Sequence, residues 1–134
     1  MDKNKGVNNA IRVPTSLKGD FFNKWVEHLT PLHHLTKREQ DVFAAFLKAR
    51  FELSHSITDE VLLDQVVMSD STKTKIKEEC GISDAFFQVI LGKLRKQKVI
   101  IDNRINPKLI PKKLNDGDKS LLLLLYFDLD EGNN

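Results

Sequence analysis

The sequence predicts a mainly α-helical domain with a small antiparallel sheet on its C-terminal side. Three observations support this prediction: apolar residues recur at helical spacing over most of residues 20–98, capping residues precede several of these segments, and two short apolar runs follow them. At 134 residues, with 40% hydrophobic and 30% charged residues, the chain has the size and composition of one globular domain. We expect an extended arm at 1–19, one domain at 20–129 and a short tail at 130–134.

The first two helices are predicted from apolar spacing and from a capping signal. Between Asp20 and Leu29 the apolar residues fall on one face of a short helix. Further along, Thr36 and Glu39 have the spacing of a capping box, in which each side chain accepts a hydrogen bond from a free backbone amide. A long amphipathic helix is therefore expected from about Lys37 to Leu53.

Three more helices are predicted before residue 98. The first should begin at Thr58, because this N-cap residue precedes two acids that interact favourably with a helix N-terminus. Its apolar stripe consists of Leu62, Leu63, Val66 and Val67. The other two, at about 71–80 and 84–98, are separated by Gly81, which suits the left-handed residue that ends many helices. Two helices joined this closely form a helix-turn-helix.

Two apolar runs predict strands after the last helix. Val99–Ile101 follows that helix directly, and Leu121–Phe127 has the continuous apolar character of a strand that is buried on both faces. We expect a turn at Asn103–Arg104 and a long connection from Asn106 to Lys119 between the two strands. The predicted product is a small sheet packed against a helical bundle.

Residues 36–129 resemble a winged helix-turn-helix domain, and the resemblance is carried by the run IKEECGISDAFFQVILGKLRKQKVI. The positions at which that family keeps its core residues are Ile76, Gly81, Ile82, Phe87 and Leu91. The first strand of the wing would begin at 98–100. The resemblance implies a mainly α fold with a small antiparallel β wing, and it does not by itself imply a function.

The outward residues of the second helix decide whether such a domain can read bases, because they enter the major groove in DNA-binding members. The expected outward set is Asp84, Ala85, Phe86, Gln88, Val89 and Gly92. Of these, only Gln88 is typical of base recognition. Exposed apolar side chains favour a protein interface, which we assign to Phe86, Val89 and Asp84. A helical phase shifted by one residue would instead place Phe86 in the core.

The charge of the chain is uneven. Lys93 to Lys113 contains eight basic residues and one acid, whereas the whole chain carries only +2. Such an excess can attract phosphate or an acidic protein, or it can simply cover a solvated face. The candidate nucleic-acid contacts are Gln88, Lys93, Arg95, Lys96, Lys98, Arg104, Lys108, Lys112 and Lys113.

The residues give no support for enzyme chemistry. The single cysteine, Cys80, excludes an intrachain disulfide and a cysteine-based zinc site. The four histidines lack metal-ligand spacing and are interpreted as surface-loop residues, and no phosphate-binding glycine loop is present. We therefore assign no catalytic, cofactor-binding or metal residue and no small-molecule substrate. Without a signal peptide or a long apolar run, the chain is expected to stay in the cytoplasm of the cell that makes it, with no membrane partner.

Most of the chain is also similar to small proteins encoded by crAss-like phages of Bacteroides. The similarity is carried by IRVPTSLKGDFF, LTKREQDVFAAFLKARFELS, TKTKIKEECGIS, FFQVILGKLRK and INPKLIP. In such phages, small proteins of unknown activity can be virion parts, including rings between portal and tail. The resemblance assigns no role to any single residue.

Two functions follow as expectations. The first is a non-enzymatic virion structural protein, a ring or connector component of the head-to-tail region. It would form a homo-oligomeric ring through the helix-turn-helix core, and its extended termini would contact neighbouring phage structural proteins. The alternative is a cytoplasmic DNA-binding protein that acts in transcription, replication or packaging.

Overall fold

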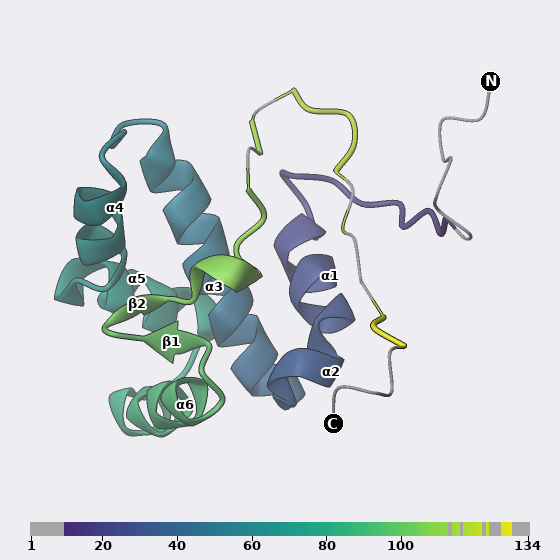
Figure 1. Ribbon diagram of the computed structural model, residues 1–134. Coiled ribbons are helices and arrows are strands. Elements are labelled where there is room, and N and C mark those ends of the chain that lie inside the picture. The colour runs from purple at the N-terminus through teal and green to yellow at the C-terminus, as the bar shows by residue number, and fades with distance from the viewer. Residues whose placement is uncertain (1–9, 113, 116, 122, 124–126, 130–134) are drawn as a thin grey trace.

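Residues 10–112, 114–115, 117–121, 123 and 127–129 are described by the computed structural model shown in Figure 1. This part of the chain is mainly helical and contains a two-stranded antiparallel sheet, as the sequence predicts. Its elements are α1 (Phe21–His28), α2 (Thr30–His33), α3 (Lys37–Ser54), α4 (Glu60–Val67), α5 (Asp70–Cys80), α6 (Asp84–Lys96), β1 (Ile100–Ile101), β2 (Arg104–Ile105) and the 3-10 helix η1 (Pro107–Leu109). The expected arm is described from residue 10 onward, and the expected tail at 130–134 lies outside the described residues.

Helix α3 is the centre of the fold, since α1, α4, α5 and α6 all pack against it. It begins with the expected capping box, in which the Glu39 carboxylate accepts a hydrogen bond from the Thr36 backbone amide at 2.9 Å. Its buried face includes Phe46, whose ring stacks on Phe87 of α6 with the centroids 6.2 Å apart. One apolar core therefore extends from α1 through α3 to α6.

Helices α1 and α2 are joined through a buried histidine. The interpretation of the histidines as surface residues is wrong for His33, which is fully buried. Its Nδ1 accepts a hydrogen bond from the Leu35 amide at 2.9 Å, so its Nε2 carries the proton and donates to the Val26 carbonyl at 2.7 Å. Both ring nitrogens are thus satisfied by backbone groups, which allows a polar ring to lie in the core.

Helix α4 begins one residue later than expected. Its N-cap is Asp59 rather than Thr58, because the Asp59 carboxylate accepts hydrogen bonds from the amides of Val61 and Leu62 at 2.9 and 3.3 Å. A carboxylate at this position satisfies two free amides and also carries the charge that a helix N-terminus favours.

The apolar stripe of α4 is narrower than predicted. Leu63 and Val67 are buried, Val66 is half-buried, and Leu62 is exposed. Consecutive residues of an α-helix are about 100° apart, so the rotation that buries Leu63 turns Leu62 toward solvent.

Helices α5 and α6 follow one another after a short turn, at the place where two helices were predicted. Gly81 ends α5 in the left-handed region with φ +62°, and the Ser83 hydroxyl accepts a hydrogen bond from the Phe86 amide at 3.1 Å to begin α6. The buried residues of α6 are Phe87, Ile90, Leu91 and Leu94, which confirms the predicted helical phase and places Phe86 outside the core. Helix α6 ends at Lys96, two residues earlier than expected.

The sheet differs from the expected one in its second strand. β1 pairs with β2, which follows after two residues, with Ile100 opposite Ile105 and Ile101 opposite Arg104. Residues 102 and 103, an aspartate and an asparagine, both have positive φ, which closes a two-residue hairpin turn. The expected strand at Leu121–Phe127 is wrong where it is described, since residues 121, 123 and 127 are exposed and outside any strand. Residues 122 and 124–126 lie outside the described part of the chain.

The segment after the hairpin returns to α1 (Figure 1). Asn106 donates from its side-chain amide to the Lys98 carbonyl at 3.0 Å and accepts from the Lys108 amide, which fixes the start of η1. The Trp25 indole then donates to the Leu109 carbonyl at 2.8 Å. The segment at η1 is thereby connected to Lys98, just after α6, and to α1.

Candidate functional site

The outward face of α6 is apolar and accessible. Phe86 is 42% exposed and Val89 is 67% exposed, although both are large hydrophobic side chains. Ala85 and Gly92 are also exposed and share this face by helical spacing. A Cβ added at Gly92 would meet no atom of the described residues within 4 Å. The face can therefore be approached closely by another molecule.

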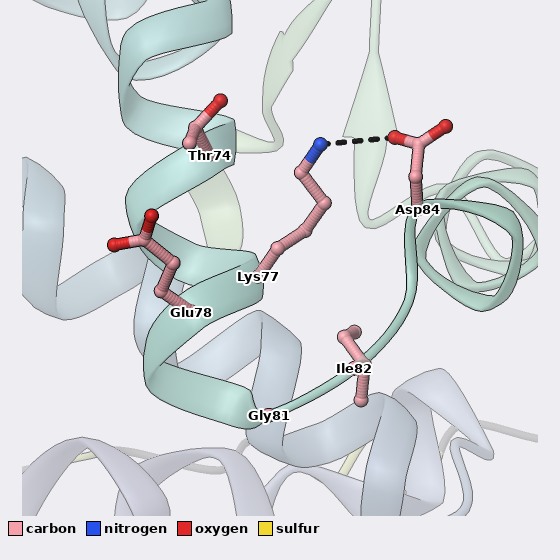
Figure 2. Close-up of a pocket in the computed structure, with 6 residues that line it drawn as sticks. All are labelled: Thr74, Lys77, Glu78, Gly81, Ile82 and Asp84. Carbon is pink, nitrogen blue, oxygen red and sulfur yellow. Dashed lines mark hydrogen bonds and ion pairs between the residues drawn. The ribbon is translucent and has the colours of Figure 1, made fainter.

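Asp84 stands at the start of α6 and is bound to Lys77 of α5 (Figure 2). The Lys77 Nζ and the Asp84 Oδ1 are 2.9 Å apart. The hydrogen bond and the charge of Lys77 lower the pKa of Asp84, and a hydrogen bond from Gln88 acts in the same direction. The Lys77 ammonium also lies 5.7 Å from the centroid of the Phe87 ring. The ion pair therefore links the start of α6 to α5, and it partly neutralises the charge of Asp84.

A shallow hollow lies between α5 and the start of α6. It has a volume of about 380 Å³ and is open to solvent. The residues around it are Thr74, Lys77, Glu78, Gly81, Ile82 and Asp84 (Figure 2). The single ammonium group in the hollow is the one already paired with Asp84. The hollow therefore follows the turn between α5 and α6, and it lacks the enclosed walls that a small-molecule site needs.

Few groups on α6 suit base recognition. Arginine, lysine, asparagine and glutamine are the side chains that read base edges, and in the first two turns of α6 only Gln88 belongs to this set. The first two turns are therefore better suited to an apolar contact than to reading a sequence.

Four of the predicted nucleic-acid contacts cluster at the C-terminal end of α6. Lys93 is half-buried, while Arg95, Lys96 and Lys98 are exposed. Among the described residues, no carboxylate forms an ion pair with any of the four. Because Lys93 and Lys96 follow Phe86 and Val89 at a spacing of seven residues, they continue the same side of the helix. We call Phe86, Val89, Lys93 and Lys96 the α6 surface.

The remaining predicted cations are less uniform. Arg104 of β2 lies 3.7 Å from the Asp64 carboxylate of α4, which is also 3.3 Å from Arg50 of α3. The ion pair between Arg104 and Asp64 therefore links the hairpin to α4. Lys108 and Lys112 are exposed, whereas the predicted contact Lys113 lies outside the described residues.

No protein-family model, curated protein or solved structure matches the chain. The functional assignment therefore rests on the geometry of the described residues. Within the described residues, no three histidine, cysteine or acidic side chains are grouped so that they could hold a metal ion. No helix in that part of the chain is long and apolar enough to cross a bilayer.

Cys80 is half-buried at the end of α5. Burial raises the pKa of its thiol, and the nearby Asp41 carboxylate raises it further. A raised pKa keeps the thiol protonated at neutral pH, and the thiolate is the nucleophilic form. The Cys80 backbone carbonyl accepts a hydrogen bond from Arg38 of α3 at 3.0 Å, so this residue contributes to packing between the two helices.

One surface was missed by the sequence reasoning. Val61 and Leu62, at the N-terminal end of α4, are 68% and 48% exposed. The sequence predicts Leu62 in the apolar stripe of this helix and assigns no role to Val61. The burial of Leu63 and Val67, four residues apart, fixes the phase of α4, and that phase directs both side chains outward. A stricter reading of the helical phase would have found them.

Proposed function

We propose that this chain is a non-enzymatic winged helix-turn-helix protein that assembles through the outer face of α6. The exposure of Phe86 and Val89 carries this proposal. In a helix that reads DNA these positions would hold polar side chains directed at base edges. Here they form an apolar face flanked by cations, and such a face favours contact with another protein.

The winged assignment is supported by the order and packing of the elements. Helices α5 and α6 both pack against α3, and the β1–β2 hairpin follows α6 directly. In this proposal the hairpin is the wing, and its two-residue turn makes it short. In this proposal Ile76, Phe87 and Leu91 are the core residues of the domain, and all three are buried.

The biological setting is proposed from the resemblance to small proteins of crAss-like phages. We propose a structural component of the virion, made in the host cytoplasm and placed in a ring or connector between head and tail. Its partners would be further copies of itself and neighbouring phage structural proteins. The exposed arm with Ile11 and Val13 supplies apolar side chains for contact with such neighbours.

The test measures molecular mass in solution by size-exclusion chromatography with light scattering over a wide range of concentration. The variant Phe86→Asp should lose assembly and keep its circular dichroism spectrum, because the acid replaces an exposed side chain in the first turn of a helix. The matched control is Leu32→Asp, at the third residue of α2 and 58% exposed, which should assemble like the wild type. Equal assembly of wild type and Phe86→Asp would refute the proposal.

A second function, binding of duplex DNA by a cytoplasmic regulator, replication factor or packaging factor, is favoured by the cations at the end of α6. Lys93, Arg95, Lys96 and Lys98 have no carboxylate partner among the described residues and could contact phosphates.

The DNA-binding alternative has its own test. A fluorescent random-sequence duplex is titrated with the protein at about 50 and 200 mM salt, since each phosphate contact adds roughly 0.9 to the salt slope. Strong binding that disappears at the higher salt and in the Arg95→Ala, Lys96→Ala, Lys98→Ala variant would support DNA binding. Absence of binding at low salt would exclude it.

A further inference from the structure

The N-terminal end of α4 carries a second exposed apolar patch with the opposite charge. Val61 and Leu62 project into solvent, and Asp59 and Glu60 beside them are exposed acids. Neither acid forms an ion pair with another described residue. We call these four residues the α4 surface.

The α4 and α6 surfaces are complementary in both polarity and charge. Each contains two exposed apolar side chains on one helix, with Val61 and Leu62 on α4 and Phe86 and Val89 on α6. The apolar pair is accompanied by two acids on α4 and by two lysines on α6. Bringing them together would remove apolar area from water and place opposite charges side by side.

We propose that the α6 surface of one copy docks on the α4 surface of the next copy, head to tail. This inference rests on the proposed function, which names the α6 surface but not what it contacts. The occupant of each surface is a second copy of this chain, because the chain itself carries both complementary halves.

The placement of the two surfaces favours a repeating contact over a contact within one chain. β2 packs on α4 and β1 packs on α6, so the hairpin lies between the two helices (Figure 1). A two-fold pairing of α6 with α6 would leave the α4 surface unused. A head-to-tail contact satisfies both surfaces and repeats, and it closes into a ring when the rotation between copies allows.

The experiment uses two variants matched in position and exposure. Leu62 is the third residue of α4 and 48% exposed, and Phe86 is the third residue of α6 and 42% exposed. An aspartate in either first turn is compatible with the helix. Leu62→Asp and Phe86→Asp should each be monomeric by light scattering. Mixing them should give a one-to-one heterodimer, since each variant retains one intact surface and the pair can make only one contact.

The outcomes separate this inference from the function on which it rests. If Leu62→Asp assembles like the wild type while Phe86→Asp does not, assembly through α6 stands and docking on α4 is overturned. If both variants are monomeric but their mixture forms no heterodimer, docking on α4 is also overturned. If Phe86→Asp assembles normally, or the wild type is always monomeric, the proposed function itself is overturned.

Charge reversal provides a second test that leaves the apolar residues unchanged. Glu60→Lys alone, and Lys93→Glu with Lys96→Glu, should each weaken assembly, and the effect should shrink as salt screens the charges. A chain that carries all three substitutions should assemble better than the Lys93→Glu, Lys96→Glu parent, because Glu60→Lys brings the net charge of the α4 surface from −2 to 0 and removes its repulsion from the reversed α6 surface. If the combined variant assembles no better than that parent, these charges do not face one another.

Discussion

The substitution of alanine for glycine should have opposite effects at two positions of the α5–α6 segment. Gly81 ends α5 with φ +62°, in the left-handed region, whereas Gly92 lies inside α6. At both positions a Cβ would meet no atom within 4 Å, so steric contact contributes nothing to either change. The two variants therefore compare backbone conformation alone.

The magnitudes follow from the two conformations. Gly81→Ala should lower the free energy of unfolding by about 1–2 kcal/mol, because alanine is strained by that amount in the left-handed region. Gly92→Ala should raise the free energy of unfolding by about 1 kcal/mol, because alanine favours the helical conformation over glycine by that amount. The two variants should thus differ by about 2–3 kcal/mol, although each adds the same methyl group.

The assay is urea unfolding followed by circular dichroism, at a protein concentration low enough to prevent association. Low concentration matters because Gly92 lies on the outward face of α6, and association would add its own stabilisation. Thermal midpoints should move in the same directions by about 4 °C per kcal/mol for a domain of this size. A destabilised Gly92→Ala monomer would show that the helix is packed differently at this point, and an unchanged Gly81→Ala would contradict the left-handed turn.

Three further predictions concern interactions inside the domain. Burial lowers the pKa of His33 from its ordinary value of 6.5, so the free energy of unfolding of the wild type should decrease as the pH falls below about 6.5. In urea unfolding at pH 7 and pH 5, His33→Gln should show a smaller difference between the two pH values than the wild type. Asp64→Ala should cost about 1–3 kcal/mol because it leaves Arg50 partly buried without its acid, while Glu60→Ala on the same helix should change stability by less than about 0.5 kcal/mol. Cys80 should react with iodoacetamide much more slowly in the folded chain than in urea, as followed by mass spectrometry, and equal rates would refute its protected environment.

The helices could be predicted because their signals are local. The capping box of Thr36 and Glu39, the left-handed Gly81 and the cap Ser83 act within a few residues, and all are present as predicted. The predicted N-cap of α4 was wrong by one residue, because Thr58 and Asp59 are both residue types that cap helices. The conformation of the backbone decides which of the two caps the helix.

The second strand could not be predicted from apolarity. An apolar run indicates burial or association, but it does not specify which segment will pair with it. Pairing was decided at Asp102 and Asn103, which adopt positive φ and return the chain at once, so that Ile105 lies opposite Ile100. The burial of His33 likewise depends on its hydrogen bond to a backbone carbonyl of α1. The pattern of side chains along the sequence does not indicate that bond.

The candidate site was partly predictable, because helical phase is a local signal. Helical phase alone predicted that Phe86 and Val89 would be exposed, and both are. The pairing of Arg104 with Asp64 joins two elements far apart in sequence, so the Arg104 charge could not be recognised as internal before the fold was known.

The short hairpin between α4 and α6 has a geometric consequence for any repeating assembly. It is held to α4 by the Asp64–Arg104 ion pair and to α6 by the packing of β1, so it fixes the angle between the two helices. In a chain of head-to-tail copies, that internal angle is repeated at every step and becomes the curvature of the assembly. Residues that never touch a neighbouring copy would then determine whether the copies close into a ring, and with what diameter.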